Sequence, residues 1–238
     1  MAEELNQLCL DAPAERILDT ALRAFHPRIA FACSLGLEDV VLLDLIWRRE
    51  CRPRIFVLDT GRLPQETYDT LAAVRARYGL PIEAYFPDTA AVQALLAAKG
   101  PNSFYASLEN RLECCRIRKV EPLGRALAGA AAWITGLRRD QGATRGGLDP
   151  FQWDADHGGM VKVNPLVHWS LEQVWDYVRV HDVPCNPLHA RGYPSIGCAP
   201  CTRAVQPGED PRSGRWWWER PEHKECGLHP QSPAKADP

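Results

Sequence analysis

The chain has 238 residues, of which 45% are hydrophobic and 24% charged, and its formal net charge is −2. This composition excludes disorder for most of the chain, and the length allows one good core with at most a small appendage. No apolar run reaches the roughly 20 residues of a membrane span, the acidic N-terminus lacks the pattern of a secretory signal, and the near-neutral charge argues against a general nucleic-acid binder. We expect a soluble, cytoplasmic, globular protein without membrane or nucleic-acid partners.

Short apolar strands alternate with amphipathic helices along the chain. This alternation predicts an α/β fold with a doubly wound, mostly parallel sheet. After about residue 183 the regular pattern gives way to Gly, Pro, Cys and Arg. The predicted strands are 29–33, 54–58, 82–86 and 131–135, and the predicted helices begin near Pro13, Leu37 and Pro64 and at a capping box that starts with Ser170.

Ligands of such sheets bind beyond the carboxyl ends of the strands. Those ends lie here at Ser34–Gly36, Asp59–Gly61 and Gly136–Asp140. The first of these loops joins a strand to a helix, where backbone N–H groups can face an anion, although an ordinary turn has the same pattern. It is not a Walker loop, because Gly-x-x-x-x-Gly-Lys-Ser/Thr occurs nowhere in the chain.

Nine cysteines are present, an odd number in a chain too long to need disulfide bonds for its stability. Four of them we interpret as small buried hydrophobic residues. The other five, clustered or flanked by charge, indicate metal or thiol chemistry. The four structural cysteines are Cys9, Cys33, Cys51 and Cys185, and the other five are Cys114, Cys115, Cys198, Cys201 and Cys226.

The two cysteine pairs are typical of a metal site, since four thiolates can bind zinc or a [4Fe–4S] cluster. The Cys198–Cys201 spacing is common to both kinds of site. The adjacent pair Cys114–Cys115 favours the cluster, because zinc sites usually separate paired cysteines by two residues or more, whereas neighbouring cysteines can bind different irons of a cluster. Zinc, or two unrelated pairs of free thiols, remains the alternative, and iron and sulfide analysis would decide.

Basic residues accompany these features in three groups. Each group alone could be a solvated face, but together they indicate a small polyanionic ligand. Cys226 has His and Lys neighbours that could lower the pKa of a thiol and expose a nucleophile. Residues 215–219, with three consecutive tryptophans, are expected to anchor the end of the chain by packing. The basic groups comprise Arg111, Arg116, Arg118 and Lys119; Arg138, Arg139 and Arg145; and Arg203, Arg212 and Arg215.

Five motifs occur together in chain order: Ser34-x-Gly36, Leu58-Asp-Thr-Gly61, Cys-Cys-x-x-x-Lys at 114–119, Gly-Cys-x-Pro-Cys-Thr-Arg at 197–203 and Lys-Glu-Cys-Gly-Leu-His at 224–229. With them the chain resembles assimilatory adenylyl-sulfate reductases, from about residue 29 to residue 229. These enzymes belong with phosphoadenylyl-sulfate reductases to the adenine-nucleotide hydrolase-like, pyrophosphatase-loop fold.

The resemblance implies reduction of adenosine 5′-phosphosulfate to sulfite and AMP with thioredoxin as electron donor, in sulfate assimilation and cysteine biosynthesis. Cys226 would be the nucleophile and would carry an S-sulfocysteine intermediate. A [4Fe–4S] cluster would be held by Cys114, Cys115, Cys198 and Cys201. The substrate would be bound by Ser34, Gly36, Leu58, Lys119, Gly136, Arg145, Arg212 and Arg215.

The implied organisation is a single nucleotide- and cluster-binding domain at 1–205, followed by a mobile C-terminal tail at 206–238. The tail would carry Cys226 and close over the substrate, and its last residues would be disordered. The family also suggests homo-oligomers.

Three alternatives stay open. The enzyme could use or also accept 3′-phosphoadenylyl sulfate, although reductases specific for it generally lack the two cysteine pairs. The chain could instead be a non-enzymatic iron–sulfur redox sensor, or a cluster-bearing tRNA-modifying protein. The tRNA-modifying protein should keep an ATP loop of the form Ser-Gly-Gly-x-Asp-Ser. Here Leu35 and Val40 depart from that form, which argues against ATP-dependent adenylation.

Overall fold

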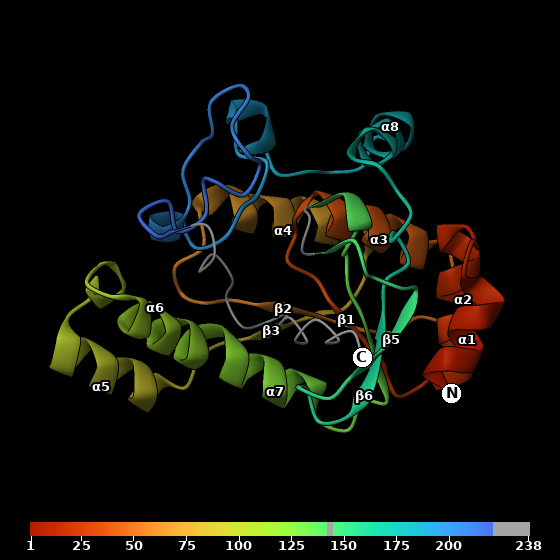
Figure 1. Cartoon of the computed structure of the whole chain (residues 1–238), viewed down its shortest axis with the longest axis horizontal. Coiled ribbons are helices and arrows are strands. Elements are labelled where there is room, and N and C mark those ends of the chain that lie inside the picture. Colours follow the sequence, from red (N-terminus) through yellow and green to blue (C-terminus); the bar gives the residue numbers. More distant parts are fainter. Residues whose placement is uncertain (142–144, 221–238) are drawn as a thin grey trace, which may run out of the picture.

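The computed structural model describes residues 1–141 and 145–220, which form a six-stranded sheet between two layers of helices (Figure 1). The strand order is β3-β2-β1-β4-β6-β5, and all neighbouring strands are parallel except β5 and β6. The predicted α/β fold with a mostly parallel sheet is therefore confirmed. The strands are β1 (Ile29–Ala32), β2 (Arg54–Leu58), β3 (Ile82–Tyr85), β4 (Ala132–Ile134), β5 (Phe151–Asp154) and β6 (Met160–Val163).

Alternate residues of the central strands face two separate cores, as the period of two in a strand requires. Phe31 and Ile134 lie in the larger core, together with apolar residues of the helices on that face. Ala30 and Trp133, their neighbours along the same strands, lie in the smaller core on the opposite face. Because both faces are covered, the strands are apolar throughout, which is the pattern that marked them in the sequence.

Helices cover both faces of the sheet (Figure 1). Figure 1 shows α3, α4 and α8 on one face and α6 and α7 on the other, with α1 and α2 near the β5 edge. The first layer comprises α2 (Ala14–Phe25), α3 (Leu37–Trp47), α4 (Gln65–Tyr78) and α8 (Leu171–His181). The other helices are α1 (Ala2–Cys9), α5 (Thr89–Lys99), α6 (Leu108–Cys115) and α7 (Glu121–Leu127).

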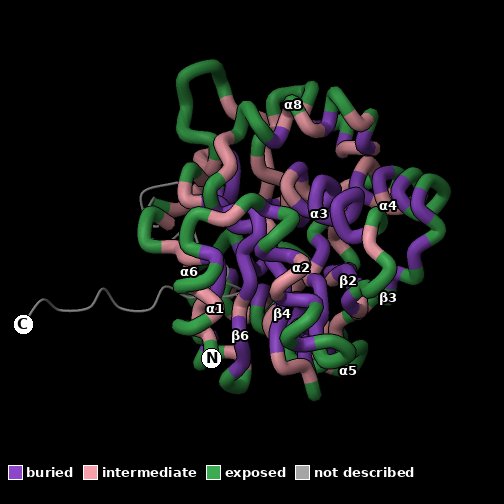
Figure 2. Tube along the Cα trace, turned by 90° about the vertical axis from the view of Figure 1, so that its right-hand side faces the viewer, coloured by how far each residue is buried: buried purple, intermediate pink, exposed green. Residues whose placement is uncertain are grey.

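Helix α3 is buried along nearly its whole length (Figure 2). Its apolar residues pack against the sheet on one side and against α8 on the other. Asp44 in its centre has no exposed surface, and its carboxylate accepts hydrogen bonds from Arg48 Nε at 2.7 Å, Tyr177 Oη at 2.6 Å and Tyr78 Oη at 3.1 Å. These bonds lower the pKa of Asp44 against the effect of burial, and they join α3 to α4 and α8.

The strand order reverses between β1 and β4, which lie side by side although β1 continues to β2 and β3 on its other edge. Such a reversal leaves a crevice at the carboxyl ends of the two strands. Two of the predicted ligand-binding loops, Ser34–Gly36 and Gly136–Asp140, follow these two strands. The topology therefore places both loops at the position where α/β sheets bind ligands.

The predicted elements agree with the observed ones to within about two residues, and the Ser170 capping box is present. The prediction for the structural cysteines is correct for Cys9 and Cys33, which are buried, but wrong for Cys51, which is exposed. Cys185 is only half-buried. In the part of the chain that the structure describes, no helix has both the length and the apolar character needed to cross a membrane.

Candidate active site

The loop after β1 is closed by a buried carboxylate. Asp39, in the first turn of α3, accepts hydrogen bonds from the Ser34 backbone N–H at 2.6 Å and from the Ser34 hydroxyl at 2.5 Å. The N–H of Gly36 donates to the Ser34 hydroxyl at 3.2 Å. Two amide donors of the loop are thus already used within it, as in an ordinary strand-to-helix turn. Ser34 itself is exposed, so a ligand can reach this residue.

The loop after β4 lies directly against this carboxylate. A Cβ atom on Gly136 would stand 2.3 Å from Asp39 Oδ1, so only glycine allows this close approach. Burial raises the pKa of Asp39 to about 6, against the lowering effect of its hydrogen bonds to Ser34. The loops that follow β1 and β4 are therefore held together at the crevice by one side chain.

Two of the arginines after β4 are used within the fold. Arg138 is buried and forms a 2.9 Å ion pair with Glu38, while Arg139 forms a 3.3 Å ion pair with Asp149. Carboxylates of the protein thus already pair with these two arginines, and the prediction that this basic group faces a polyanionic ligand stays a prediction. Arg145, the third member, is half-buried and donates to the side-chain oxygen of Gln141.

The adjacent cysteines lie where α6 passes into a π-helix, Arg116–Val120, which continues directly into α7. π-Helical turns are rare and frequently mark functional sites. The charge of Arg118 acts on the thiol of Cys114, and Arg118 and Lys119 border the same cavity as the two cysteines. Lys119 and Arg118 are both buried. The sequence Cys-Cys-x-x-Arg-Lys thus presents two thiols and two cations to one side of the helix.

The second cysteine pair lies on a short 3-10 turn, Ala199–Cys201, with Cys198 just before it. The hydroxyl of Thr60, after β2, lies 3.2 Å from the Cys198 sulfur. Arg118 donates to the Thr60 carbonyl oxygen at 2.7 Å. The loop after β2 therefore contacts both cysteine-bearing segments.

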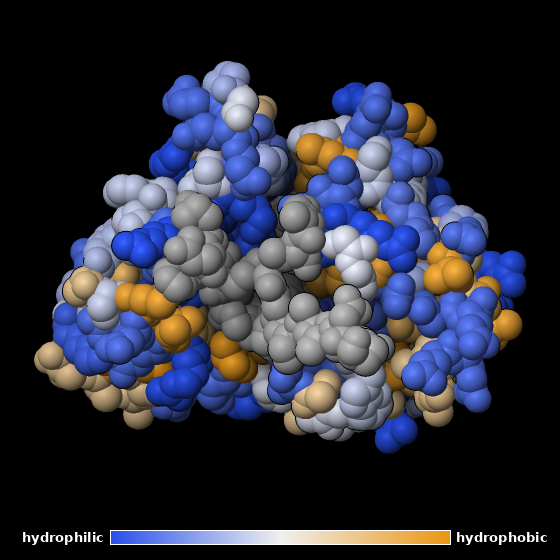
Figure 3. All heavy atoms as spheres, viewed as in Figure 1, coloured by the Kyte–Doolittle hydropathy of each residue, from blue (hydrophilic) through white to orange (hydrophobic). Residues whose placement is uncertain are grey.

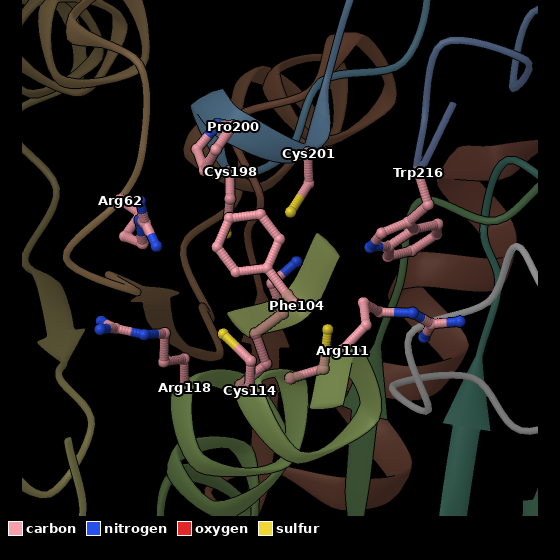
Figure 4. Close-up of a pocket in the computed structure, with 11 residues that line it drawn as sticks. Arg62, Phe104, Arg111, Cys114, Arg118, Cys198, Pro200, Cys201 and Trp216 are labelled. Carbon is pink, nitrogen blue, oxygen red and sulfur yellow. The ribbon is translucent and has the colours of Figure 1, made fainter. Parts of the chain in front are cut away.

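All four paired cysteines line a single cavity (Figure 4). In this view the sulfur atoms of Cys114 and Cys201 point into the space between the two segments, beside the ring of Phe104. The cavity is bordered by cations, and Nε of Arg118 is buried with no hydrogen-bond partner among the described residues. The remaining lining residues are Arg62, Arg111, Lys119, Cys115, Cys198, Pro200 and Trp216.

The thiols of the cavity differ in acidity. Burial raises the pKa of Cys198, but the charge of Lys119 and the hydroxyl of Thr60 outweigh it, so the net shift is downward. Burial, followed by the charge of Cys198, raises the pKa of Cys201 to about 12. Within residues 1–141 and 145–220, no three His, Cys, Asp or Glu side chains are placed as ligands of a metal ion.

Arg215 lies near enough to Cys198 for its charge to lower the pKa of that thiol, because residues 214–216 run beside residues 201–203. Thr202 and Arg215 form an antiparallel bridge, and the N–H of Trp216 donates to the Cys201 carbonyl oxygen at 3.1 Å. The Arg215 guanidinium lies against Gly197, where a Cβ atom would stand 2.3 Å from it. Glycine before Cys198 therefore makes room for the arginine, a relation that the sequence motif alone does not reveal.

The predicted tryptophan anchor is confirmed at Trp216, which is 1% exposed and lies between two guanidinium groups. The guanidinium carbons of Arg111 and Arg215 are each 4.8 Å from the ring centroid. Arg111 also forms a buried ion pair with Glu219, with N–O distances of 2.8 and 2.9 Å. These contacts join the segment after residue 214 to α6.

The other predicted site residues that the structure describes do not line this cavity. Gly36 and Gly136 are half-buried in the two crevice loops, and Leu58 is half-buried at the end of β2. Arg212 is half-buried three residues before Arg215, whereas Arg116 is exposed. Cys226 and the last nine residues of the chain, predicted to be disordered, lie outside the described residues.

Several residues of the site were not found from the sequence. Arg62, Phe104 and Thr60 border the cavity or its cysteines, and Glu38 and Gln141 contact the arginines after β4. Thr60 lies within the predicted ligand loop Asp59–Gly61, which was the signal that could have found it. The positions of Arg62 and Phe104 in the sequence give no such signal.

Known proteins match this chain over most of its length. A family model for the phosphoadenosine phosphosulfate reductase domain matches residues 28–204. An adenosine 5′-phosphosulfate reductase of Allochromatium vinosum is 54% identical over 96% of this chain and 88% of its own, and one of Burkholderia cepacia is 52% identical over 86% and 81%. The crystal structure of a phosphoadenylyl-sulfate reductase from Candida auris, in a phosphate complex, superimposes with a TM-score of 0.74 at 27% identity, over 86% of this chain and 96% of that one.

These matches extend across both crevice loops and, in the longest of them, nearly the whole chain, and they agree with the resemblance carried by the five motifs. The chain therefore belongs to the phosphoadenosine phosphosulfate reductase family, together with proteins named adenosine 5′-phosphosulfate reductases.

Proposed function

We propose that this protein reduces adenosine 5′-phosphosulfate to sulfite and AMP in assimilatory sulfate reduction, with thioredoxin as electron donor, and that it works in the cytoplasm. The observation that carries the proposal is the 54% identity with the Allochromatium reductase over 96% of the chain. The geometry supports it, because the chain has the strand-order reversal at which α/β sheets bind ligands and also a cavity lined by four cysteines and several cations.

The four cysteines of the cavity are proposed to hold a [4Fe–4S] cluster. The donor set fits, because four thiols from two segments face one space, and the surrounding cations offset the negative charge of thiolates. The unpartnered Nε–H of Arg118 offers a further donor to such a group. When bound, the cluster would supply a fixed electric field beside the substrate and order the two segments. Its ligands would be Cys114, Cys115, Cys198 and Cys201.

Cations of the chain are proposed to grip the phosphosulfate group. Attack on sulfur moves negative charge onto the departing phosphate oxygen, and fixed cations near that oxygen stabilise the transition state. Lys119 and Arg215 would bind the phosphosulfate group near the cysteine cavity, since the charges of both lower the pKa of Cys198. Arg145 and Arg212 would complete the set, and Ser34, Gly36, Leu58 and Gly136 would line the adenosine pocket.

Cys226 is the proposed nucleophile, carried on a tail, residues 206–238, that follows a domain of residues 1–205. Its thiolate would attack the sulfate sulfur, the bond from sulfur to the bridging oxygen would break, and AMP would leave with that oxygen. The product on the enzyme is an S-sulfocysteine. A thiolate of thioredoxin would then attack the Cys226 sulfur, releasing sulfite, and the second thiol of thioredoxin would resolve the mixed disulfide. The dithiol thus supplies the two electrons.

The intact mass of the protein tests this mechanism after anaerobic incubation with adenosine 5′-phosphosulfate and without thioredoxin. We expect one added sulfo group, and thioredoxin should release it as sulfite. The Cys226→Ser variant should gain nothing, while Cys51→Ser, which removes an exposed cysteine far from the cavity lining, should gain the group as the unaltered protein does. A cluster-loaded protein that gains no mass would contradict the assignment of Cys226.

The second candidate substrate is 3′-phosphoadenylyl sulfate. The Candida auris structure favours it, because a phosphoadenylyl-sulfate reductase shares this fold at 27% identity. We expect a much higher kcat/KM for the nucleotide without the 3′-phosphate, since the more similar relatives at 52–54% identity are named for it. Comparable values for the two nucleotides would show a dual specificity.

A further inference from the structure

Arg138 and Gln141, in the loop that follows β4, are bound to the first turn of α3. Glu38 Oε1 accepts two hydrogen bonds from this loop, from Arg138 Nε at 3.0 Å and from Gln141 Nε2 at 2.9 Å, and it lies 2.9 Å from Arg138 Nη2 in an ion pair. Glu38 is only 18% exposed and Arg138 only 4%. This arrangement fixes the side chain of Gln141 from its nitrogen end.

The oxygen end of the same amide faces two donors. Gln141 Oε1 accepts from the Arg138 backbone N–H at 3.2 Å and from Nη1 of Arg145. A glutamine amide has a donor group and an acceptor oxygen, so it can connect a carboxylate to a guanidinium. The three side chains Glu38, Gln141 and Arg145 therefore form a continuous chain of hydrogen bonds from α3 to the proposed substrate arginine.

The neutral amide has a particular electrostatic effect. Arg138 meets the carboxylate of Glu38 directly, so its charge is compensated within the protein. Gln141 orients Arg145 without bringing a compensating negative charge. Because the side chain of Arg145 is already oriented, less of its conformational freedom is lost when an anionic ligand binds.

We propose that Gln141, held by Glu38, is a positioning residue for Arg145, and that this relay sets the affinity of the protein for the phosphosulfate group. The inference rests on the proposed function, in which Arg145 contacts the substrate. It assigns a role to the polar contacts that join α3 to the loop after β4.

Steady-state reduction of adenosine 5′-phosphosulfate by Gln141→Ala and Gln141→Met tests the relay. Both variants remove the amide group, with its NH2 donor and its oxygen acceptor, and methionine keeps the length of the side chain. We expect KM to rise about tenfold with a smaller change in kcat, because a misplaced binding group weakens substrate binding. Gln65→Ala is the matched control, since exposed Gln65 donates to Asp69 within α4 and its replacement should leave both constants unchanged.

Gln141→Glu separates orientation from charge. This variant keeps an acceptor for Arg145 but adds a negative charge beside both Arg145 and Glu38. We expect KM to rise at least as much as in Gln141→Ala. A KM equal to that of the unaltered protein would contradict the proposed importance of a neutral partner.

A double-mutant cycle with Arg145→Ala completes the test. If Gln141 acts through Arg145, Gln141→Ala should change KM less than twofold when Arg145 is already absent. A full tenfold effect in that background would overturn the relay. Failure of the inference is distinct from failure of the proposed function. If the unaltered protein and Gln65→Ala reduce the substrate and Gln141→Ala does so with the same KM, the relay alone is overturned.

Discussion

Asp39 is a carboxylate 93% buried between two loops of the crevice, and its burial has a cost that depends on pH. Burial raises the pKa of Asp39 from 3.8 to about 6. Between these values the folded protein binds a proton that the unfolded chain has released. By linkage, the stabilising effect of this proton is complete below about pH 4 and is lost as the pH rises through 6.

The Asp39→Asn variant isolates this effect, because asparagine does not titrate. We expect the free energy of unfolding of the unaltered protein, relative to that of the variant, to fall by about 3 kcal/mol between pH 4 and pH 7. Urea unfolding at several pH values measures both proteins. A difference that stays constant, or that grows with pH, would contradict the raised pKa.

At the scale of elements, the segment after residue 214 is held to α6 by the buried Arg111–Glu219 pair. The two side chains are 1% and 7% exposed. Because the removal of one partner from a buried pair leaves the other charge without compensation in an apolar surrounding, we expect Glu219→Gln to lower the free energy of unfolding by about 3 kcal/mol. Thermal and urea unfolding would measure the change.

The matched control is Glu209→Gln, which removes the carboxylate of the exposed ion pair with Arg203. Surface pairs contribute little to stability, so this variant should unfold almost as the unaltered protein does. Equal effects of the two substitutions would show that the Arg111–Glu219 pair does not hold the segment in the way its burial indicates.

At the scale of the whole molecule, the proposed cluster would bridge parts of the chain that are far apart in sequence. The adjacent cysteines belong to α6, and the second pair follows the long irregular segment after α8. A group that binds only the folded state stabilises it, so we expect removal of iron to lower the unfolding temperature by roughly 10 °C. Anaerobic unfolding before and after chelation, with iron and sulfide analysis, provides the test. Bound zinc, or an unchanged temperature, would contradict it.

The parts of the fold that the sequence predicts well are those with strong apolar periodicity. Strands β1 to β4 and the helices between the first three strands were found, and β1, β2 and β4 are largely buried because both sheet faces are covered there. Helix α5 was missed since only Leu95 in it is buried, so it lacks an apolar stripe. β5 and β6 were missed although they are as long as β1, because polar residues interrupt them: Gln152 and Asp154 in β5 and Lys162 in β6.

The site was likewise predictable only in part. Its position at the carboxyl ends of β1 and β4 follows from topology, and the meeting of the two cysteine pairs was expected from the family resemblance. The sequence could not tell which arginines face ligand and which meet carboxylates, because that depends on contacts between distant elements. Arg138 and Arg145 are seven residues apart in one loop, yet one meets Glu38 and the other meets Gln141.

The π-helical turn between α6 and α7 sets the rotational phase of two helices against each other. Leu123, Ala126 and Leu127 fix α7 on the sheet, while the cysteine pair lies before the turn. A π-helical turn holds about one residue more than an α-helical turn, so the deletion of a single residue within 116–120 would restore α-helical spacing there and shift Arg118 and Lys119 relative to Cys114 and Cys115. The π-helical turn therefore determines where the two buried cations lie relative to the two thiols, and a change in its length would alter the cavity while α7 keeps its contacts with the sheet.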